Sequence, residues 1–332
     1  MESVASVTDS EAQRKGGSRA GGTASNTDEW KISAGGRGMK QAILGVGAIG
    51  GLIGTVLSSL GEEVIVVVRP EGLPSYPRRL TLERPSGSLT APVKAVANLT
   101  ESIDVLWIAT KTYQLPAALE AVQSLPECAV PLLNGLDHVA TLRTRFGQHR
   151  VVPGTIAVEA EKAGPGRFVQ RSPMVRLNLA ASAEPRLGTV VGRLAALGFA
   201  CRFVVNEQTL LWGKLCFLGP FALVTSASGL NIGEVLADRV WKQKLDAATT
   251  EACAVANASG AEIDEEQIHA AFAAAPPGMR SSMQKDVLAG RKLELDAISS
   301  PIVRGGHGYG IGVSTTAGLA AAIREKLSPR SP

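Results

Sequence analysis

The first candidate for chemistry in this sequence is a glycine loop near the N-terminal end, with glycines spaced as G-x-G-x-x-G. Its members are Gly45, Val46, Gly47, Ala48, Ile49 and Gly50. In a turn between strand and helix, the first glycine permits a tight bend, the second lets the backbone approach a pyrophosphate, and the third lets helix and strand pack closely. The first N–H groups of the helix then face the phosphates. The loop predicts dinucleotide binding, with a ligand-free glycine-rich turn as the alternative.

A cation lies where such a fold distinguishes NAD from NADP. The β-branched run that begins at Glu63 ends at Arg69, roughly twenty residues beyond the glycines. An acidic residue here binds the ribose 2′-hydroxyl of NAD, whereas a guanidinium suits the 2′-phosphate of NADP. Arg69 therefore predicts NADP(H) as the cofactor, and an ordinary solvated arginine is the alternative.

A lysine in an apolar setting is the candidate for acid–base chemistry. Lys214 is surrounded in sequence by Trp212, Leu215 and Phe217, whose apolar side chains would lower the pKa of a buried amine. An ammonium at this place could donate a proton to a developing alkoxide and stabilise its charge. From the local sequence alone, a surface lysine lying over Trp212 is an equally good interpretation.

The histidines and cysteines show no spacing typical of a metal site, so we predict no metal. We interpret the four histidines as structural or solvated: His138, His149, His269 and His307. The four cysteines lie among apolar residues and are interpreted as buried, reduced thiols.

Alternating strands and helices position these residues in the first half of the chain. Lys40–Leu44 is an apolar strand, Gly51–Leu60 a helix that Gly61 ends, and 63–68 a second strand, which together form one βαβ unit. The same alternation continues with a strand at 104–109, a helix at 115–125 and a strand at 129–133. This order predicts a parallel sheet covered on both faces, a Rossmann-type doubly wound α/β fold.

The character of the sequence changes near Val205, where long helical patterns take over. The predicted helices are Leu210–Ser228, Ile232–Ala258, Glu265–Ala274, Leu293–Gly306 and Thr315–Lys326. We predict an NADP-binding Rossmann domain at 39–205 and an all-helical substrate and catalytic domain at 206–328. Residues 1–38 are rich in small and polar residues and are predicted to be a disordered tail. Translation starts at Met1 or at Met39, immediately before the first strand.

Bulk composition excludes some classes of function. The net charge of +4 is small for 332 residues and does not demand nucleic acid or a membrane surface as a partner. No apolar run approaches the roughly 18 residues that span a bilayer, and the N-terminal region lacks the features of a signal or transit peptide. We expect a cytoplasmic protein.

Several separated segments resemble the ketopantoate reductase (2-dehydropantoate 2-reductase) family, from Met39 to about Lys326. Besides the glycine loop and Arg69, the matching segments are 109–114, 132–136, 154–166, 211–215 and 281–296. The resemblance implies an oxidoreductase of pantothenate biosynthesis. It also implies roles in cofactor binding for Lys111, Asn134, Ala160 and Glu294.

The resemblance further implies the residues that meet the substrate. Lys214 would be the catalytic proton donor, and Asn134 and Ser282 would contact the substrate. Two of the implied residues also have ordinary structural explanations: Ser282 as a helix N-cap, and Glu294 as an acid favoured by the dipole in the first turn of a helix.

The sequence departs from the family where asparagines serve the polar groups of the substrate. The positions four, eight and eighteen residues after Lys214 hold Leu218, Ala222 and Ile232 instead. Asn231 lies one place before the last of these and is a candidate substitute through a shifted loop. These departures leave the identity of the substrate open.

Three functions follow as hypotheses. The leading one is reduction of 2-dehydropantoate to pantoate, with a hydride from NADPH and a proton from Lys214. A second is a paralogue that reduces a different 2-oxo acid or ketone, which Leu218 and Ala222 favour because apolar side chains cannot pair with a substrate hydroxyl. The third is a non-catalytic NADP(H) redox sensor. We expect a small-molecule partner, and a homodimer is a candidate assembly.

Overall fold

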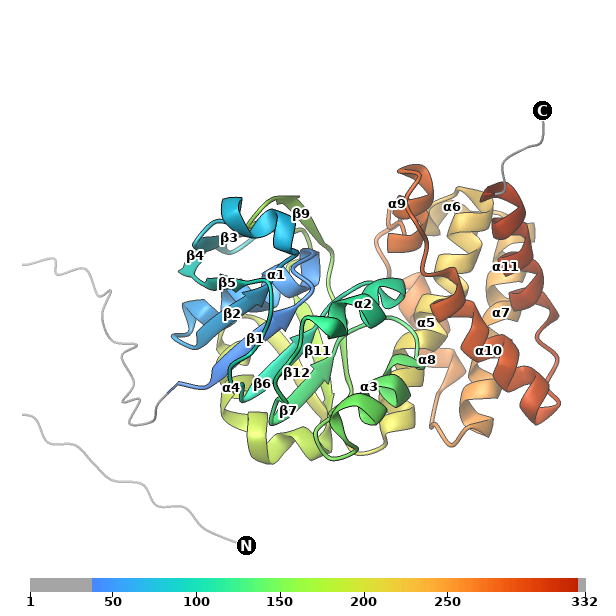
Figure 1. The fold of residues 1–332 in the computed structure, drawn as a ribbon. Helices are drawn as coiled ribbons and strands as arrows, with labels where there is room; N and C mark the ends of the chain where they lie inside the picture. The colour runs from blue at the N-terminus through green and yellow to red at the C-terminus, as the bar shows by residue number, and fades with distance from the viewer. Residues whose placement is uncertain (1–37, 328–332) are drawn as a thin grey trace, which may run out of the picture. The chain divides into compact units, whose positions relative to one another are not determined.

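The computed structural model describes residues 38–327 (Figure 1). The tail predicted from the sequence lies outside these residues, apart from Gly38. The described chain begins immediately before the first strand, β1 (Lys40–Leu44), and ends with the helix α11 (Ser314–Leu327).

A five-stranded parallel sheet forms the centre of the first half. Its strand order is β5–β2–β1–β6–β7, with β1 in the middle. The flanking strands are β5 (Lys94–Val96), β2 (Glu63–Val67), β6 (Val105–Ile108) and β7 (Cys128–Pro131). The chain adds β2 and β5 on one side of β1 and then β6 and β7 on the other. This order confirms the predicted Rossmann-type sheet.

Apolar layers cover both faces of this sheet, so its strands are buried on both sides. Ile43 and Trp107 face the helix α1 (Ala48–Ser59), whereas their neighbours Ala42 and Ile108 belong to a separate apolar cluster on the other face. The helices α2 (Leu115–Glu120) and α3 (His138–Phe146) contribute to that second cluster. The alternation of side chains along each strand therefore produces the two layers.

Two further sheets complete the first half of the chain. One has the strand order β4–β3–β10–β9, and the other β12–β11–β8. Their strands are β3 (Arg79–Arg84), β4 (Gly87–Pro92), β8 (Gly154–Ala157), β9 (Ala160–Gly164), β10 (Arg167–Gln170), β11 (Val175–Ala180) and β12 (Phe199–Val204). The remaining elements are α4 (Glu184–Ala196) and the 3-10 turns η1 (Pro70–Ser75), η2 (Thr112–Gln114) and η3 (Ala181–Ala183).

The second half is helical, as predicted, and is built around α5 (Glu207–Ser228) (Figure 1). Asn206 caps α5 by accepting hydrogen bonds from the backbone N–H groups of Gln208 and Thr209. The helices that follow are α6 (Ile232–Ala237), α7 (Arg239–Ala258), α8 (Glu265–Ala273), α9 (Ser282–Leu288), α10 (Leu295–Tyr309) and α11.

Two predicted helices are shorter than the sequence pattern suggested. The helix predicted at Ile232–Ala258 is divided into α6 and α7 because Asp238 is extended and its carboxylate accepts hydrogen bonds from the N–H groups of Val240 and Trp241. The helix predicted at 115–125 ends at Glu120, and Val122 then forms a β-bridge with Leu99.

The helix α5 is long and apolar enough to cross a membrane, contrary to the expectation that no segment approaches this length. Its most apolar 18-residue window is 78% buried inside the protein. Many of its side chains belong to the apolar cluster shared with α7, α10 and α11. The composition of α5 is therefore explained by its place at the centre of the helical half.

Candidate active site

The glycine loop has the geometry that its spacing predicts. Gly45 has a φ of +94°, and a Cβ there would lie 2.7 Å from the backbone nitrogen of Thr110. A Cβ on Gly50 would lie 2.1 Å from the carbonyl oxygen of Gly45. By contrast, a Cβ on Gly47 would meet no atom within 4 Å. Gly47 is also the N-cap of α1 and provides no side chain to cap the first N–H groups, so the loop can accommodate a pyrophosphate.

The side chains of the loop and Ala160, all predicted to hold the cofactor, lie close together in the structure. Ala48 opens α1, and Val46, Ile49 and Ala160 pack against the apolar cluster that contains α1. Ala160 is the first residue of β9, and Lys162 of the same strand donates a hydrogen bond to the carbonyl oxygen of Val46 at 3.3 Å. The structure therefore brings the strand of Ala160 beside the glycine loop.

Arg69 follows β2 and is exposed to solvent. Within residues 38–327 its guanidinium makes no hydrogen bond or ion pair, so the predicted cation is available to a phosphate.

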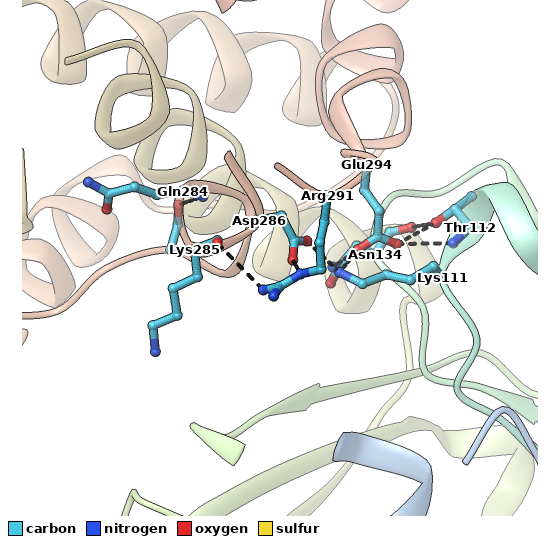
Figure 2. A network of polar contacts seen from close by, with 9 residues as sticks. Lys111, Thr112, Asn134, Gln284, Lys285, Asp286, Arg291 and Glu294 are labelled. Atoms are coloured by element: carbon cyan, nitrogen blue, oxygen red, sulfur yellow. Dashed lines mark hydrogen bonds and ion pairs between the residues drawn. The ribbon is translucent and has the colours of Figure 1, made fainter. Parts of the chain in front are cut away.

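A polar network joins the first half to the helical half, as Figure 2 shows. Lys111, which follows β6, donates to Glu294 Oε2 and to Asp286 Oδ2, both at 3.0 Å. Glu294 also accepts from the backbone N–H and the hydroxyl of Thr112, each at 3.0 Å, and from Asn134 Nδ2 at 3.1 Å. Two carboxylates of the helical half thus bind three residues at the carboxyl ends of neighbouring strands, which is where α/β sheets bind ligands.

No role was predicted for Asp286 or Arg291, although both lie in the matched segment 281–296. Asp286 is 6% exposed, and Arg291 Nε donates to its Oδ1 at 2.7 Å (Figure 2). Asp286 therefore holds the cations Lys111 and Arg291 on its two oxygens. The aspartate inside the motif was the available signal, but its partner Lys111 is 175 residues away.

The charges of this network stabilise one another. Burial opposes the charge of Lys111, but the carboxylates of Glu294 and Asp286 outweigh it and raise the pKa of the lysine. Burial likewise disfavours ionised Glu294, yet Lys111 and the donors of Thr112 hold the pKa of this carboxyl below its usual value. Both groups are therefore charged at neutral pH. Glu294 is the N-cap residue of α10, but its side chain makes no capping bond and turns to the other half instead.

The N-G loop after β7 is fitted against α10. Gly135 has a φ of +80°, and a Cβ there would lie 2.3 Å from the carbonyl oxygen of Ala297. Only a glycine allows the backbone so close to the helix. This contact places Asn134 against Glu294.

Lys214 lies on α5 and is half-buried, with its amine making no hydrogen bond or ion pair inside the described range. Burial lowers the pKa of Lys214 to about 8, with the charge of Glu294 acting in the opposite direction. Trp212 and Leu215 belong to the buried core, which agrees with the expected apolar setting. The amine of Lys214 thus holds its proton less tightly than an exposed lysine and interacts electrostatically with Glu294.

Ser282 is not the N-cap that its sequence also suggested. Ser281 caps α9 by accepting a hydrogen bond from the N–H of Gln284 at 3.0 Å. Ser282 is the first residue of the helix and is exposed, and its hydroxyl has no partner in the described chain. The capping role is filled by its neighbour, which leaves Ser282 available for a ligand.

The residues that replace the asparagines of the family occupy different environments. Ala222 and Ile232 are fully buried in the helical core, whereas Leu218 is half-buried. Asn231 caps α6 and forms a reciprocal capping box with Glu234. The side-chain oxygen Oδ1 of Asn231 is therefore engaged in helix capping.

Comparison with known proteins identifies relatives of both halves. The family described as "Ketopantoate reductase PanE/ApbA" matches residues 41–184, and its C-terminal part matches residues 206–327. The 2-dehydropantoate 2-reductase of Caulobacter vibrioides is 30% identical over 295 residues, covering 85% of this chain and 97% of that protein.

Solved structures of similar proteins share the fold. A ketopantoate reductase from Ralstonia eutropha superimposes with a TM-score of 0.75 at 25% identity, covering 86% of this chain and 98% of the other. A D-mandelate dehydrogenase solved with NADH and anilino(oxo)acetate gives 0.77 at 21% identity, covering 87% and 98%. The matches in sequence and fold confirm the predicted NADP(H) cofactor and an oxidoreductase acting on the CH–OH/C=O pair: the chain belongs to the ketopantoate reductase family.

Proposed function

We propose that this protein reduces a 2-oxo acid to a 2-hydroxy acid with NADPH, and that 2-dehydropantoate is the first substrate to test. The observation that carries the proposal is Lys214. A half-buried ammonium with a pKa of about 8, next to the network of Glu294, has the properties of a general acid near neutral pH.

Each predicted residue has a part in this reaction. When bound, the nicotinamide supplies the hydride. Lys214 donates its proton to the carbonyl oxygen of the substrate and stabilises the negative charge that develops there. Asn134 and Ser282 bind and orient the substrate.

Cofactor binding is assigned to the residues around the sheet edge. The backbone of the loop at 45–50 holds the pyrophosphate, and Arg69 binds the 2′-phosphate. Ala160, whose side chain is small, would contact the cofactor at the start of β9. Lys111 and Glu294 are assigned to the opposite side, where Glu294 would hold Lys111 and Asn134 in position for the cofactor.

A second substrate class is favoured by the half-buried side chain of Leu218. It lies one helical turn from Lys214, where the family has an asparagine, so the adjoining surface cannot pair with a hydroxyl. The similarity to a D-mandelate dehydrogenase is in keeping with a 2-oxo acid that carries an apolar substituent. The chain would then be a paralogue with a less hydroxylated substrate.

An assay of NADPH absorbance against a panel of 2-oxo acids tests the proposal. The panel contains 2-dehydropantoate, its analogue without the hydroxyl group, and aryl and branched alkyl 2-oxo acids. Turnover with any member supports the reaction class, and the ratio of kcat/KM between the first two substrates decides between the two classes. If NADPH is bound but consumed with none of them, the behaviour is that of a redox sensor.

We further propose that the protein is cytoplasmic and forms a homodimer. Within each chain, we propose that the boundary between the two domains lies near residue 205. A dimeric ketopantoate reductase from Staphylococcus aureus has the same fold, with a TM-score of 0.70. Light scattering on the purified protein measures the mass directly, and cell fractionation tests the location.

A further inference from the structure

A buried histidine that this mechanism does not use lies at the same site. His138 opens α3, four residues after Asn134, and is 2% exposed. Neither of its ring nitrogens has a hydrogen-bond partner in the part of the chain that the structure describes. Burial of unpaired polar atoms is costly, so these nitrogens need a partner from outside the described chain, such as a ligand. The sequence suggested only a structural or solvated histidine here.

The contact between α3 and α5 brings His138 toward Lys214. Near the C-terminal end of α3, Arg143 pairs with Glu207 at the start of α5 at 2.7 Å. One turn earlier on α3 and one turn later on α5, Val139 and Leu211 belong to the same apolar cluster and line a common groove. The helices therefore run past each other in opposite directions. The N-terminal end of α3, where His138 lies, is therefore directed toward the part of α5 that follows Leu211 and contains Lys214.

The electrostatics of the imidazole agree with this placement. Burial lowers the pKa of His138 to about 4, and the charge of Lys214 contributes to the lowering while that of Glu294 opposes it. His138 is therefore neutral at pH 7, with one ring N–H that can donate and one nitrogen that can accept. A neutral imidazole has no extra proton to transfer, so it is suited to binding rather than to acid catalysis.

The site has few other polar groups on the side of α5. The positions that carry asparagines in the family hold Leu218 and the fully buried Ala222, and Asn231 is engaged in capping α6. A substrate held at Lys214 thus lacks amide partners from these positions. His138, on the neighbouring helix α3, interacts electrostatically with the same amine.

We propose that His138 belongs to the substrate site and that its imidazole forms a hydrogen bond with an oxygen of the 2-oxo acid held beside Lys214. This inference rests on the proposed reduction of a 2-oxo acid. His138 binds and orients the substrate, while Lys214 transfers the proton.

Four variants of the full-length protein test the role. His138→Phe and His138→Leu remove both polar nitrogens, whereas His138→Asn and His138→Gln each keep one donor and one acceptor. With the best substrate of the panel, the apolar variants should raise KM about tenfold, the value of one hydrogen bond. At least one amide variant should have a KM closer to that of the parent, and the one that does so indicates which ring nitrogen binds. The Kd for NADPH, measured by fluorescence without substrate, should not change.

Thermal stability separates substrate binding from a structural role, because replacing a structural residue should lower Tm. Because the nitrogens are buried without partners, His138→Leu or His138→Phe should keep or raise Tm. Arg143→Ala is the matched control: it breaks the ion pair in the same helix contact and should lower Tm without raising KM. An unchanged KM in a folded apolar variant overturns the inference, as does an equal rise of KM in all four variants. A parent enzyme that reduces no 2-oxo acid rejects the proposed function itself, and the inference with it.

Discussion

Lys214 has to combine a positive charge with a pKa low enough for the proton to leave. Burial provides the low pKa, and the carboxylate of Glu294 keeps the ammonium populated at neutral pH. An exposed lysine would hold its proton up to its usual value of 10.5. The apolar residues around Lys214 therefore act on the chemistry through desolvation.

Replacing Lys214 should affect the chemical step and leave cofactor binding intact. Lys214→Ala should lower kcat by about 10²–10⁴-fold, the usual contribution of general acid catalysis. Lys214→Arg should not restore it, because a guanidinium does not give up its proton readily. Steady-state kinetics and NADPH fluorescence measure the two quantities. Near-parental kcat in the alanine variant would mean that another group donates the proton.

The pH profile of the parent enzyme reports the same group. Because the protonated form is the donor, kcat should be full below the pKa of about 8 and fall as pH rises through it. A profile that stays level up to pH 10 would show that the lysine is not desolvated in the working enzyme.

Arg69 should determine the choice between the two cofactors. Its guanidinium is exposed at the end of β2 and has no partner among residues 38–327, so a 2′-phosphate would gain a charge-assisted hydrogen bond. Arg69→Ala should weaken NADPH by about 10- to 100-fold and NADH little. Fluorescence titration with both cofactors measures this, and an equal loss for the two would exclude recognition of the 2′-phosphate.

At the scale of the elements, the sequence predicted the parts that depend on local pattern. The βαβ unit around the glycine loop was predictable because three glycines and two apolar strands lie within thirty residues. The pairing of β3 with β10 was not, because it joins residues that lie some eighty positions apart in the chain. The resemblance supplied Lys111 and Glu294, but their contact spans 183 residues and is a product of the fold.

The N-G loop depends on Gly135 for its fit against α10. Gly135→Ala combines the cost of a positive φ, about 1–2 kcal/mol, with a clash against the backbone of Ala297. Gly61→Ala is the matched control, since Gly61 has a φ of +85° and open space around its Cβ position. Urea denaturation should show the larger loss of stability for Gly135→Ala, and only this variant should also lower kcat. Equal losses would mean that the loop can move away from α10.

Across the whole described chain, charged contacts join the sheet-bearing half to the helical half. Besides the contacts of Lys111, Lys285 pairs with Glu159 at 2.6 Å. A folded-state pKa below the usual 4.5 means that Glu294 stabilises the fold above that pH and that this contribution is lost as pH falls. Because the pKa of Lys111 is raised above 10.5, the ion pairs of this lysine persist at alkaline pH up to that value.

The pH dependence of Glu294→Gln checks this account. At pH 7 the variant should be less stable by about 1.5–3 kcal/mol, the value of hydrogen bonds to a charged group. The difference should shrink below about pH 4.5, where the parent carboxylate also becomes neutral. Glu83→Gln breaks the exposed pair with Arg167 and should change stability little at either pH. Urea denaturation at several pH values gives the comparison, and a constant difference would contradict it.

The position of α5 in the chain has a consequence for biosynthesis. Most of the helices that pack against it, from α6 to α11, are encoded after it, whereas α3 precedes it. As the chain leaves the ribosome, a 22-residue apolar helix therefore emerges ahead of the helices α7 to α11 that bury much of it. Only when α11 has emerged can the core around α5 close, and until then a nascent chain exposes a segment with the length and hydropathy of a membrane span. Premature termination before Ser314 would leave that segment incompletely covered, so such fragments should be substrates for chaperones and proteases.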